Sequence, residues 1–228
     1  MKRNILLIVI VFQFVLNACT TDADDKWSAS EVCPDTGTNL YGEPNRGTFV
    51  DARDGQVYEY TTIGDQVWMA KNLNYNVEYS MCYDNNPENC EIYGRLYSLH
   101  LNGENSIDSL DKNAVTTVCP EGWRLPNEDD FKKLLNNMDH DEKVAARQLM
   151  STYLWSEQWG GCGTNDCGFN ALPSGFCFSN ATCDRLNIAT NFSSISMINV
   201  ALMNSLIIEN SAEVGETYSW NSIRCIKE

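Results

Sequence analysis

The stretch CPEGWRLPNEDDFKKLL, residues 119–135, decides how this chain folds. Its first half combines a proline, a glycine and alternating apolar residues, which predicts a turn and then a short extended segment. Pro126 disfavours helix at the residue before it, and Asn127 is a good helix N-cap. Apolar residues then recur with helical spacing at Phe131, Leu134, Leu135 and Met138. The sequence therefore predicts a strand-to-helix junction here.

Three acidic residues, Glu128, Asp129 and Asp130, directly follow this N-cap. Negative charge in the first turn of a helix is stabilised by the helix dipole. A metal site is the alternative use of such a triplet. We favour the helix-end interpretation, because the dipole accounts for these charges without a ligand.

The chain begins with the features of an exported protein. A basic Met1-Lys2-Arg3 precedes an apolar segment at 5–16, which is too short to cross a bilayer. The sequence LNAC that ends at Cys19 resembles a bacterial lipobox, although Asn17 at position −2 is less usual than a small residue. The resemblance implies a lipoprotein signal peptide at 1–18 and lipid on Cys19, which would anchor the protein to a membrane. A plain secretory signal with a chance cysteine is the alternative.

We therefore expect an exported, lipid-anchored protein at the outer membrane or cell surface, and Thr20 after the cysteine is compatible with outer-membrane sorting. Removing residues 1–18 leaves 210 of the 228 residues and changes the formal charge from −15 to −17. Such an acidic chain repels nucleic acid, so we expect no nucleic-acid partner. Residues 19–46 are polar and aperiodic, which predicts a flexible acidic tether before one folded domain at 47–228.

The domain is predicted to be α+β, with short antiparallel strands, one or two helices and long loops. Strands are expected at 48–50, 56–63 and 66–70, joined by the turns Asp54-Gly55 and Gly64-Asp65. A second helix is expected from Asp141 to Met150. The segment 151–178 is predicted to be a long structured loop, and 194–208 and 218–226 are predicted to be β-rich.

Ten cysteines in an exported chain indicate disulfide bonds. Lipid would occupy Cys19. Short intervening loops favour three local pairs, namely Cys82–Cys90, Cys162–Cys167 and Cys177–Cys183. The first pair encloses a polar segment with an Asn-Pro turn, which predicts a loop. Zinc is the weaker alternative, because neither late pair has the Cys-x-x-Cys spacing of common zinc sites.

Six sequence blocks occur in order along the chain: DGQVY (54–58), IGDQVWMAKNLNY (63–75), YGRLY (93–97), CPEGWRLP (119–126), GFNALPSGF (168–176) and SIRC (222–225). In this order they resemble the Fibrobacter succinogenes major paralogous domain over roughly residues 47–227. That family occurs largely in secreted and lipid-anchored bacterial surface proteins. The resemblance implies a C-type lectin-like fold with disulfide-stapled loops, similar in outline to formylglycine-generating enzymes. It implies no catalytic residue, because no activity is established for the family.

The C-type lectin-like resemblance also implies a disulfide between Cys119 and Cys225, which leaves Cys33 in the tether, either free or paired between chains. The tripeptide Glu43-Pro44-Asn45 matches a calcium- and sugar-binding motif of C-type lectins. It lies too early in the chain for that role, and we interpret it as a turn. The chain also departs from the family pattern of a Trp-Ser-Ser-Thr type segment, for which residues 189–194 are the nearest equivalent, with Phe192 in the aromatic position.

The sequence favours binding over catalysis, and we expect no enzyme activity, cofactor or metal. His100 and His140 are the two histidines, and no nucleophile elbow, phosphate loop or zinc-protease motif is present. The first hypothesis is adhesion to carbohydrate such as plant cell-wall polysaccharide, with exposed tryptophans stacking on sugar rings: Trp155, Trp159 and Trp220. A core position for these residues is the alternative. A structural or protein-interaction lipoprotein is the second hypothesis, and a cysteine-dependent modifying enzyme is the third.

Overall fold

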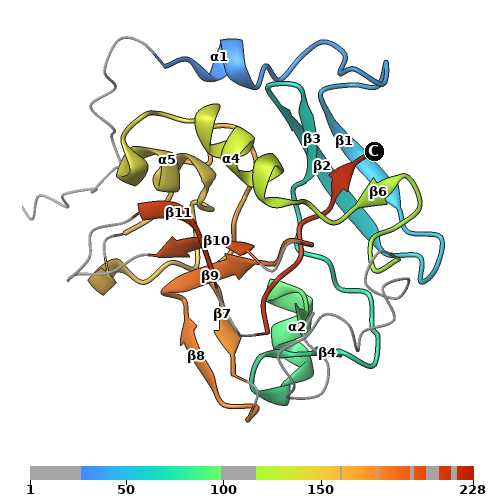
Figure 1. Cartoon of the computed structure of the whole chain (residues 1–228), viewed down its shortest axis with the longest axis vertical. Coiled ribbons are helices and arrows are strands. Elements are labelled where there is room, and N and C mark those ends of the chain that lie inside the picture. The colour runs from blue at the N-terminus through green and yellow to red at the C-terminus, as the bar shows by residue number, and fades with distance from the viewer. Residues whose placement is uncertain are drawn as a thin grey trace, which may run out of the picture.

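The computed structural model describes residues 27–98, 117–159, 161–178, 180–195, 198–203, 211–216 and 220–228. Two five-stranded sheets form the body of the α+β fold (Figure 1). The first sheet has the order β1 (Arg46–Val50), β2 (Val57–Ile63), β3 (Gln66–Met69), β12 (Ile226–Lys227) and β6 (Trp123–Arg124). The second has the order β11 (Ser211–Glu216), β10 (Ile198–Met203), β9 (Ala189–Phe192), β7 (Ser174–Cys177) and β8 (Cys183–Leu186).

Neighbouring strands pair antiparallel except at β7 and β9, which pair in parallel. A small third sheet joins β4 (Ser80–Met81) to β5 (Leu96–Tyr97). The helical elements are α1 (Ala29–Val32), η1 (Tyr83–Asn85), α2 (Pro87–Tyr93), α4 (Glu128–Asn136), α5 (Glu142–Leu149) and η3 (Glu157–Trp159). None of the helices in the described residues combines the length and the apolar character needed to span a bilayer.

The strand-to-helix junction forms as predicted, with β6 leading through Pro126 into α4. The Asn127 side chain accepts from the Asp130 amide, and the Asp130 carboxylate accepts from the Asn127 amide, which makes a capping box. Phe131 is fully buried and stacks on Trp68, with ring centroids 5.5 Å apart. This contact fixes the helix against the first sheet.

The acidic triplet serves the helix end, as the favoured interpretation predicted. Asp130 pairs with Arg124 at 2.6 Å. Burial opposes ionisation of Asp130, but hydrogen bonds from Arg124 and Asn127 hold its pKa below the ordinary value. Among the described residues, no three His, Cys, Asp or Glu side chains gather into a metal-binding group.

The early meander and the second helix are confirmed. Strands β1, β2 and β3 pair in sequence, and the Asp141 side chain caps α5. The predicted strand at 218–226 is shorter than expected. Its residues Trp220, Asn221 and Ser222 bridge to three different partners, namely Cys177, Tyr97 and Phe192, before β12 joins the first sheet. The last segment therefore links all three sheets.

Three of the predicted disulfides are present: Cys82–Cys90, Cys119–Cys225 and Cys177–Cys183. The predicted Cys162–Cys167 pair is wrong, because Cys167 bonds to Cys33, 134 residues away. Cys162 is also disulfide-bonded. Short sequence separation misled the prediction here, since tertiary packing brings residue 33 beside residue 167.

The flexible tether predicted for 19–46 is wrong from Trp27 onward. The Trp27 indole N–H donates to the Asn137 carbonyl at 2.8 Å, and its ring packs against the core. Cys33 is only 2% exposed. The Asn45 amide is buried and donates to the carbonyls of Pro34 and Thr36. The turn of this segment lies just before it, at Asn39–Gly42, and Pro44 bridges to Thr38. The folded body therefore begins well before residue 47, while residues 1–26, including Cys19, lie outside the described residues.

Arg224 lies fully buried where the two sheets meet. Its guanidinium donates to the Asn72 side chain and to the carbonyls of Met69, Phe169 and Asn170. It lies against the rings of Phe169 and Phe192, 4.8 and 5.3 Å from their centroids. A chain of buried hydroxyl contacts continues from Asn72 through Ser222 to Ser174 and Thr190. This polar network joins the first sheet to the second.

Candidate functional site

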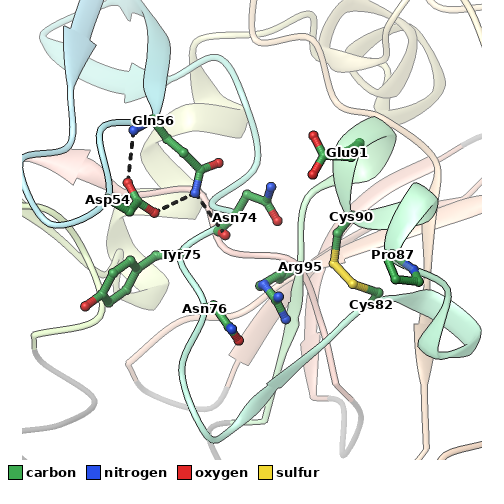
Figure 2. A pocket seen from close by; sticks show the side chains of 10 residues that line it. All are labelled: Asp54, Gln56, Asn74, Tyr75, Asn76, Cys82, Pro87, Cys90, Glu91 and Arg95. Atoms are coloured by element: carbon green, nitrogen blue, oxygen red, sulfur yellow. Dashed lines mark hydrogen bonds between the residues drawn. A yellow bond between two sulfur atoms is a disulfide. The ribbon is translucent and has the colours of Figure 1, made fainter.

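An open groove of about 540 Å³ lies between the β1–β2 turn, the segment after β3 and the Cys82–Cys90 loop (Figure 2). Segments distant in sequence thus meet at one surface. The groove is lined by Asp54, Gln56, Asn74, Tyr75, Asn76, Cys82, Pro87, Cys90, Glu91 and Arg95. Smaller hollows of about 420 and 310 Å³ lie elsewhere on the surface.

Two buried tyrosines fix the floor of the groove. The Tyr58 hydroxyl accepts from the Asn74 amide at 3.0 Å, and the Tyr97 hydroxyl donates to the Tyr75 carbonyl at 2.8 Å. Both rings are fully buried. Burial raises the pKa of Tyr58 to about 12 and that of Tyr97 well above its ordinary value, so both phenols keep their protons at neutral pH.

The near side of the groove is the turn that joins β1 to β2. The Gln56 side-chain amide donates to the Asp54 carboxylate at 2.5 Å and to the Asn74 carbonyl at 3.1 Å. The Asp54 carboxylate also accepts from the Gln56 backbone amide. The Gln56 side chain therefore connects the turn to the floor of the groove. Figure 2 shows its amide nitrogen between the Asp54 carboxylate and the Asn74 carbonyl.

Tyr75 is also a lining residue, and its ring points away from Arg95 and the Cys82–Cys90 disulfide (Figure 2). The Arg53 guanidinium lies over this ring, 3.9 Å from its centroid. Arg53 is itself held by Asp51 and by the carbonyls of Thr117 and Val118. The ring is thus supported from one side by a fixed cation.

The far wall is the Cys82–Cys90 loop, which is more regular than the predicted polar loop. Asn86 caps α2 by accepting from the Glu88 amide, and Pro87 stands in the first turn, where its missing N–H costs nothing. The helix ends at Gly94, whose φ is +77°. A Cβ there would lie 2.8 Å from the Asn72 Cβ, so this position requires glycine.

Arg95 follows this glycine, and its backbone amide donates to the Leu73 carbonyl at 3.0 Å. The side chain is partly buried and extends between Asn76 and the Cys82–Cys90 disulfide (Figure 2). Its one described hydrogen bond is a long contact of 3.5 Å to the Ser80 hydroxyl. Among the described residues, no carboxylate oxygen lies within 4.0 Å of its nitrogens.

Trp155 and Trp220, two of the three predicted ligand contacts, do not line this groove. Trp155 is 6% exposed, and its indole N–H donates to the Ser151 hydroxyl and the Ala171 carbonyl, so its prediction as an exposed ligand contact is wrong. Trp220 is half-buried and packs against a cluster that includes Met81 and Tyr83. The Trp159 side chain, like His100, lies outside the described part of the structure, and His140 borders the 420 Å³ hollow.

One exposed aromatic that the sequence prediction missed is Phe178. It is 44% exposed beside the turn of the β7–β8 hairpin, which the Cys177–Cys183 disulfide closes. Phe176 holds it edge-on, with ring centroids 5.3 Å apart. The groove was missed because its residues come from separate segments. The strongest signal of the groove in the sequence was the alternation of asparagines at residues 72, 74 and 76, followed by a short disulfide loop.

Comparison with known proteins gives one family. The family model described as the Fibrobacter succinogenes major domain matches residues 61–227, which is more than half of the chain. No curated protein and no solved structure matches the chain. The match contains most of the groove lining and both sheets from β3 onward, whereas α1 and β1 lie before it.

Proposed function

The chain belongs to the Fibrobacter succinogenes major domain family, and we propose on this basis and from the groove that it is a lipid-anchored cell-surface protein that binds carbohydrate. The observation that carries the proposal is the composition of the groove. Three amide side chains, two carboxylates, one arginine and one tyrosine border a single open depression. This set matches the chemistry of a sugar more closely than that of an apolar ligand.

Sugar hydroxyls both donate and accept hydrogen bonds, and Asn and Gln side chains offer both functions in one plane. Hydrogen bonds with Tyr58, Tyr97 and Gln56 hold the backbone of Asn74 and Tyr75 in place before a ligand arrives. Such preorganisation reduces the entropy that binding must overcome.

The place of the groove also supports a role in surface binding. In Figure 1, α1 lies at one end of the molecule, whereas α2, β4 and the β7–β8 hairpin lie toward the other end. Seven residues would separate Cys19 from Trp27, and these eight Cα-to-Cα steps span at most about 28 Å. The domain would then stand close to the membrane with the Cys82–Cys90 loop directed away from it.

The C-type lectin-like fold is part of the same proposal. The Cys119–Cys225 disulfide joins the start of the central helix region to the end of the chain, as that resemblance implies. Binding without catalysis is also proposed. A cysteine-dependent enzyme is disfavoured, because the described residues contain no free cysteine.

A protein-binding role is the second candidate, and the exposed Phe178 favours it. Aromatic residues held rigidly at a surface often dominate protein interfaces. Ile92 on α2 is 49% exposed and adds apolar surface on the neighbouring loop.

The test is binding of the full mature chain, oxidised and in detergent, to insoluble cellulose, xylan and a glycan array, with and without calcium. We expect saturable glycan binding that weakens about five- to tenfold in Asn76→Ala, which removes one amide from the groove. Asn136→Ala, an exposed asparagine on α4, is the matched control and should bind like the parent. Absence of glycan binding in every condition would overturn the proposal and favour a protein partner.

A further inference from the structure

Arg95 differs from the other arginines whose guanidinium contacts are described. Arg46, Arg53 and Arg124 each pair with an aspartate, at 2.8, 2.7 and 2.6 Å. Arg224 uses carbonyl and amide oxygens instead. Arg95 has only the 3.5 Å contact to Ser80, near the limit of a hydrogen bond. The Ser80 hydroxyl is already engaged, since it accepts from the Val77 amide and donates to the Val77 carbonyl.

The carboxylates of the groove do not neutralise this cation. Both Asp54 oxygens accept from Gln56, which directs them toward the β1–β2 turn. Glu91 is exposed on α2 and lies beyond 4.0 Å from Arg95. A guanidinium carries five N–H donors in a planar fork that matches a carboxylate. Most of these donors therefore remain available to a ligand in the groove.

The overall charge limits which anionic ligand can approach. The chain has a formal net charge of −15, so a polymer with a carboxylate on every unit is repelled. An isolated carboxylate next to Arg95 experiences mainly the local charge, because at physiological ionic strength interactions between exposed charges are largely screened beyond about 8 Å. The remaining lining of Asn74, Asn76 and Gln56 is neutral and suits hydroxyl groups.

We propose that Arg95 receives a carboxylate, and that the groove binds a largely neutral polysaccharide that carries isolated uronic acid groups. This inference rests on the proposed carbohydrate-binding function and adds the class of ligand. The carboxylate forms a two-pronged hydrogen bond with the Arg95 guanidinium, while the amide side chains contact hydroxyls of the same or the next sugar. An acidic peptide would satisfy Arg95 equally, but it would leave the amide-rich lining without matching hydroxyls.

The experiment compares three polymers on the full mature chain: a xylan sparsely substituted with glucuronic acid, the same xylan after its carboxyl groups are reduced to alcohols, and polygalacturonate. We expect the substituted xylan to bind at least about tenfold more tightly than its reduced form, since the loss of a charge-assisted hydrogen bond weakens binding by at least that factor. Polygalacturonate should bind more weakly than the substituted xylan, because of the net negative charge.

Arg95→Gln should abolish the preference between the two xylans. Arg95→Lys should restore only part of it, because an ammonium cannot form the planar fork. Lys71→Gln removes one positive charge outside the groove lining and should retain the full preference. Thermal unfolding of each variant distinguishes lost recognition from lost folding.

Equal binding of both xylans, unaltered by Arg95→Gln, would overturn this inference and leave carbohydrate binding intact. Tighter binding of polygalacturonate would overturn the requirement for isolated carboxylates. Binding to none of the three polymers would overturn this inference, and only a further absence of binding to cellulose and the glycan array would overturn the proposed function.

Discussion

Arg224 and Arg95 both contact the segment Asn72–Leu73, and they use their side-chain hydrogen-bond donors in opposite ways. Arg224 is fully buried, donates to the Asn72 side chain and three carbonyls, and lies against two phenylalanine rings. Arg95 is partly buried beside a groove, and only its backbone amide binds this segment, at the Leu73 carbonyl. Burial lowers the pKa of Arg224 to about 9, which still leaves it protonated at neutral pH.

The contrast separates a structural cation from a recognition cation. A guanidinium whose donors are satisfied inside the fold stabilises the arrangement of the strands around it. A guanidinium whose donors face an open groove contributes little to folding and remains available to a ligand. Both residues contact the Asn72–Leu73 segment, so mutation of each one tests the same distinction.

The largest expected effect is that of Arg224→Gln. The substitution removes the cation and leaves several buried oxygens without donors, so we expect a loss of about 3–5 kcal/mol in the free energy of unfolding. Urea denaturation followed by tryptophan fluorescence measures it. Arg95→Gln is the matched control and should change stability by no more than about 0.5 kcal/mol. Equal losses in the two variants would abolish the distinction between the arginines.

The next largest loss of stability is expected on removal of two short disulfides, Cys82–Cys90 and Cys177–Cys183. Replacing Cys82 and Cys90 by serine removes a short covalent loop, which costs about 2.5 kcal/mol in the chain-entropy model. The double serine variant of Cys177 and Cys183 should lose a similar amount, about 2.2 kcal/mol, because its loop is nearly as short. Glycan binding should weaken in the first variant alone, since only that disulfide lines the groove. Equal loss of binding in both would show that general stability, not the groove wall, limits binding.

Much of the framework could be predicted from the sequence because its signals are local. The Asn127 cap and the helical spacing after it each depend on a few adjacent residues, and both formed. The β1–β2 connection is longer than the predicted two-residue turn, because Val50 pairs with Val57. The helix inside the Cys82–Cys90 loop was missed because a seven-residue helix starting at Asn86-Pro87 resembles a turn. The Cys33–Cys167 bond was missed because it depends on packing between residues 134 positions apart.

The groove was harder to predict than the framework, for a physical reason. A pocket is a property of surfaces that meet, and Gln56, Asn74 and Arg95 carry no shared motif. The sequence also gave no measure of burial, so Trp155 was assigned to the surface although it fills the core. Likewise, Arg224 and Arg95 look alike as residues, and only their contacts assign them different roles.

Alkaline pH tests the buried tyrosines that connect the framework to the groove floor. Because burial raises the pKa of Tyr58 to about 12, the folded state retains a proton that the unfolded chain releases near pH 10. Its contribution to stability is therefore complete below pH 10 and is lost as the pH rises toward 12, by about 2 kcal/mol. Tyr97, whose pKa is raised further, adds to the same loss.

Denaturation at stepped pH values, with phenolate absorbance recorded in parallel, measures this effect. Tyr58→Phe cannot ionise and should flatten part of the decline above pH 10. A decline of the same size in that variant would show that other groups cause it. Glycan binding should fall over the same interval, because both hydroxyls hold the backbone of Asn74 and Tyr75.

The smallest effect on stability is expected for Gln56→Ala, and it is the sharpest test of preorganisation. The Gln56 amide ties Asp54 to the Asn74 carbonyl at a partly exposed position, so its loss should cost no more than about 1 kcal/mol. Binding should nevertheless weaken about threefold to fivefold, because the Asn74–Tyr75 segment must then be ordered by the ligand. Gln158→Ala, an exposed glutamine on η3, is the control. Unaltered affinity in Gln56→Ala would mean that Tyr58 and Tyr97 alone fix the floor of the groove. The order of the groove would then come from the buried framework, and framework and recognition would be less separate than the comparison of Arg224 with Arg95 indicates.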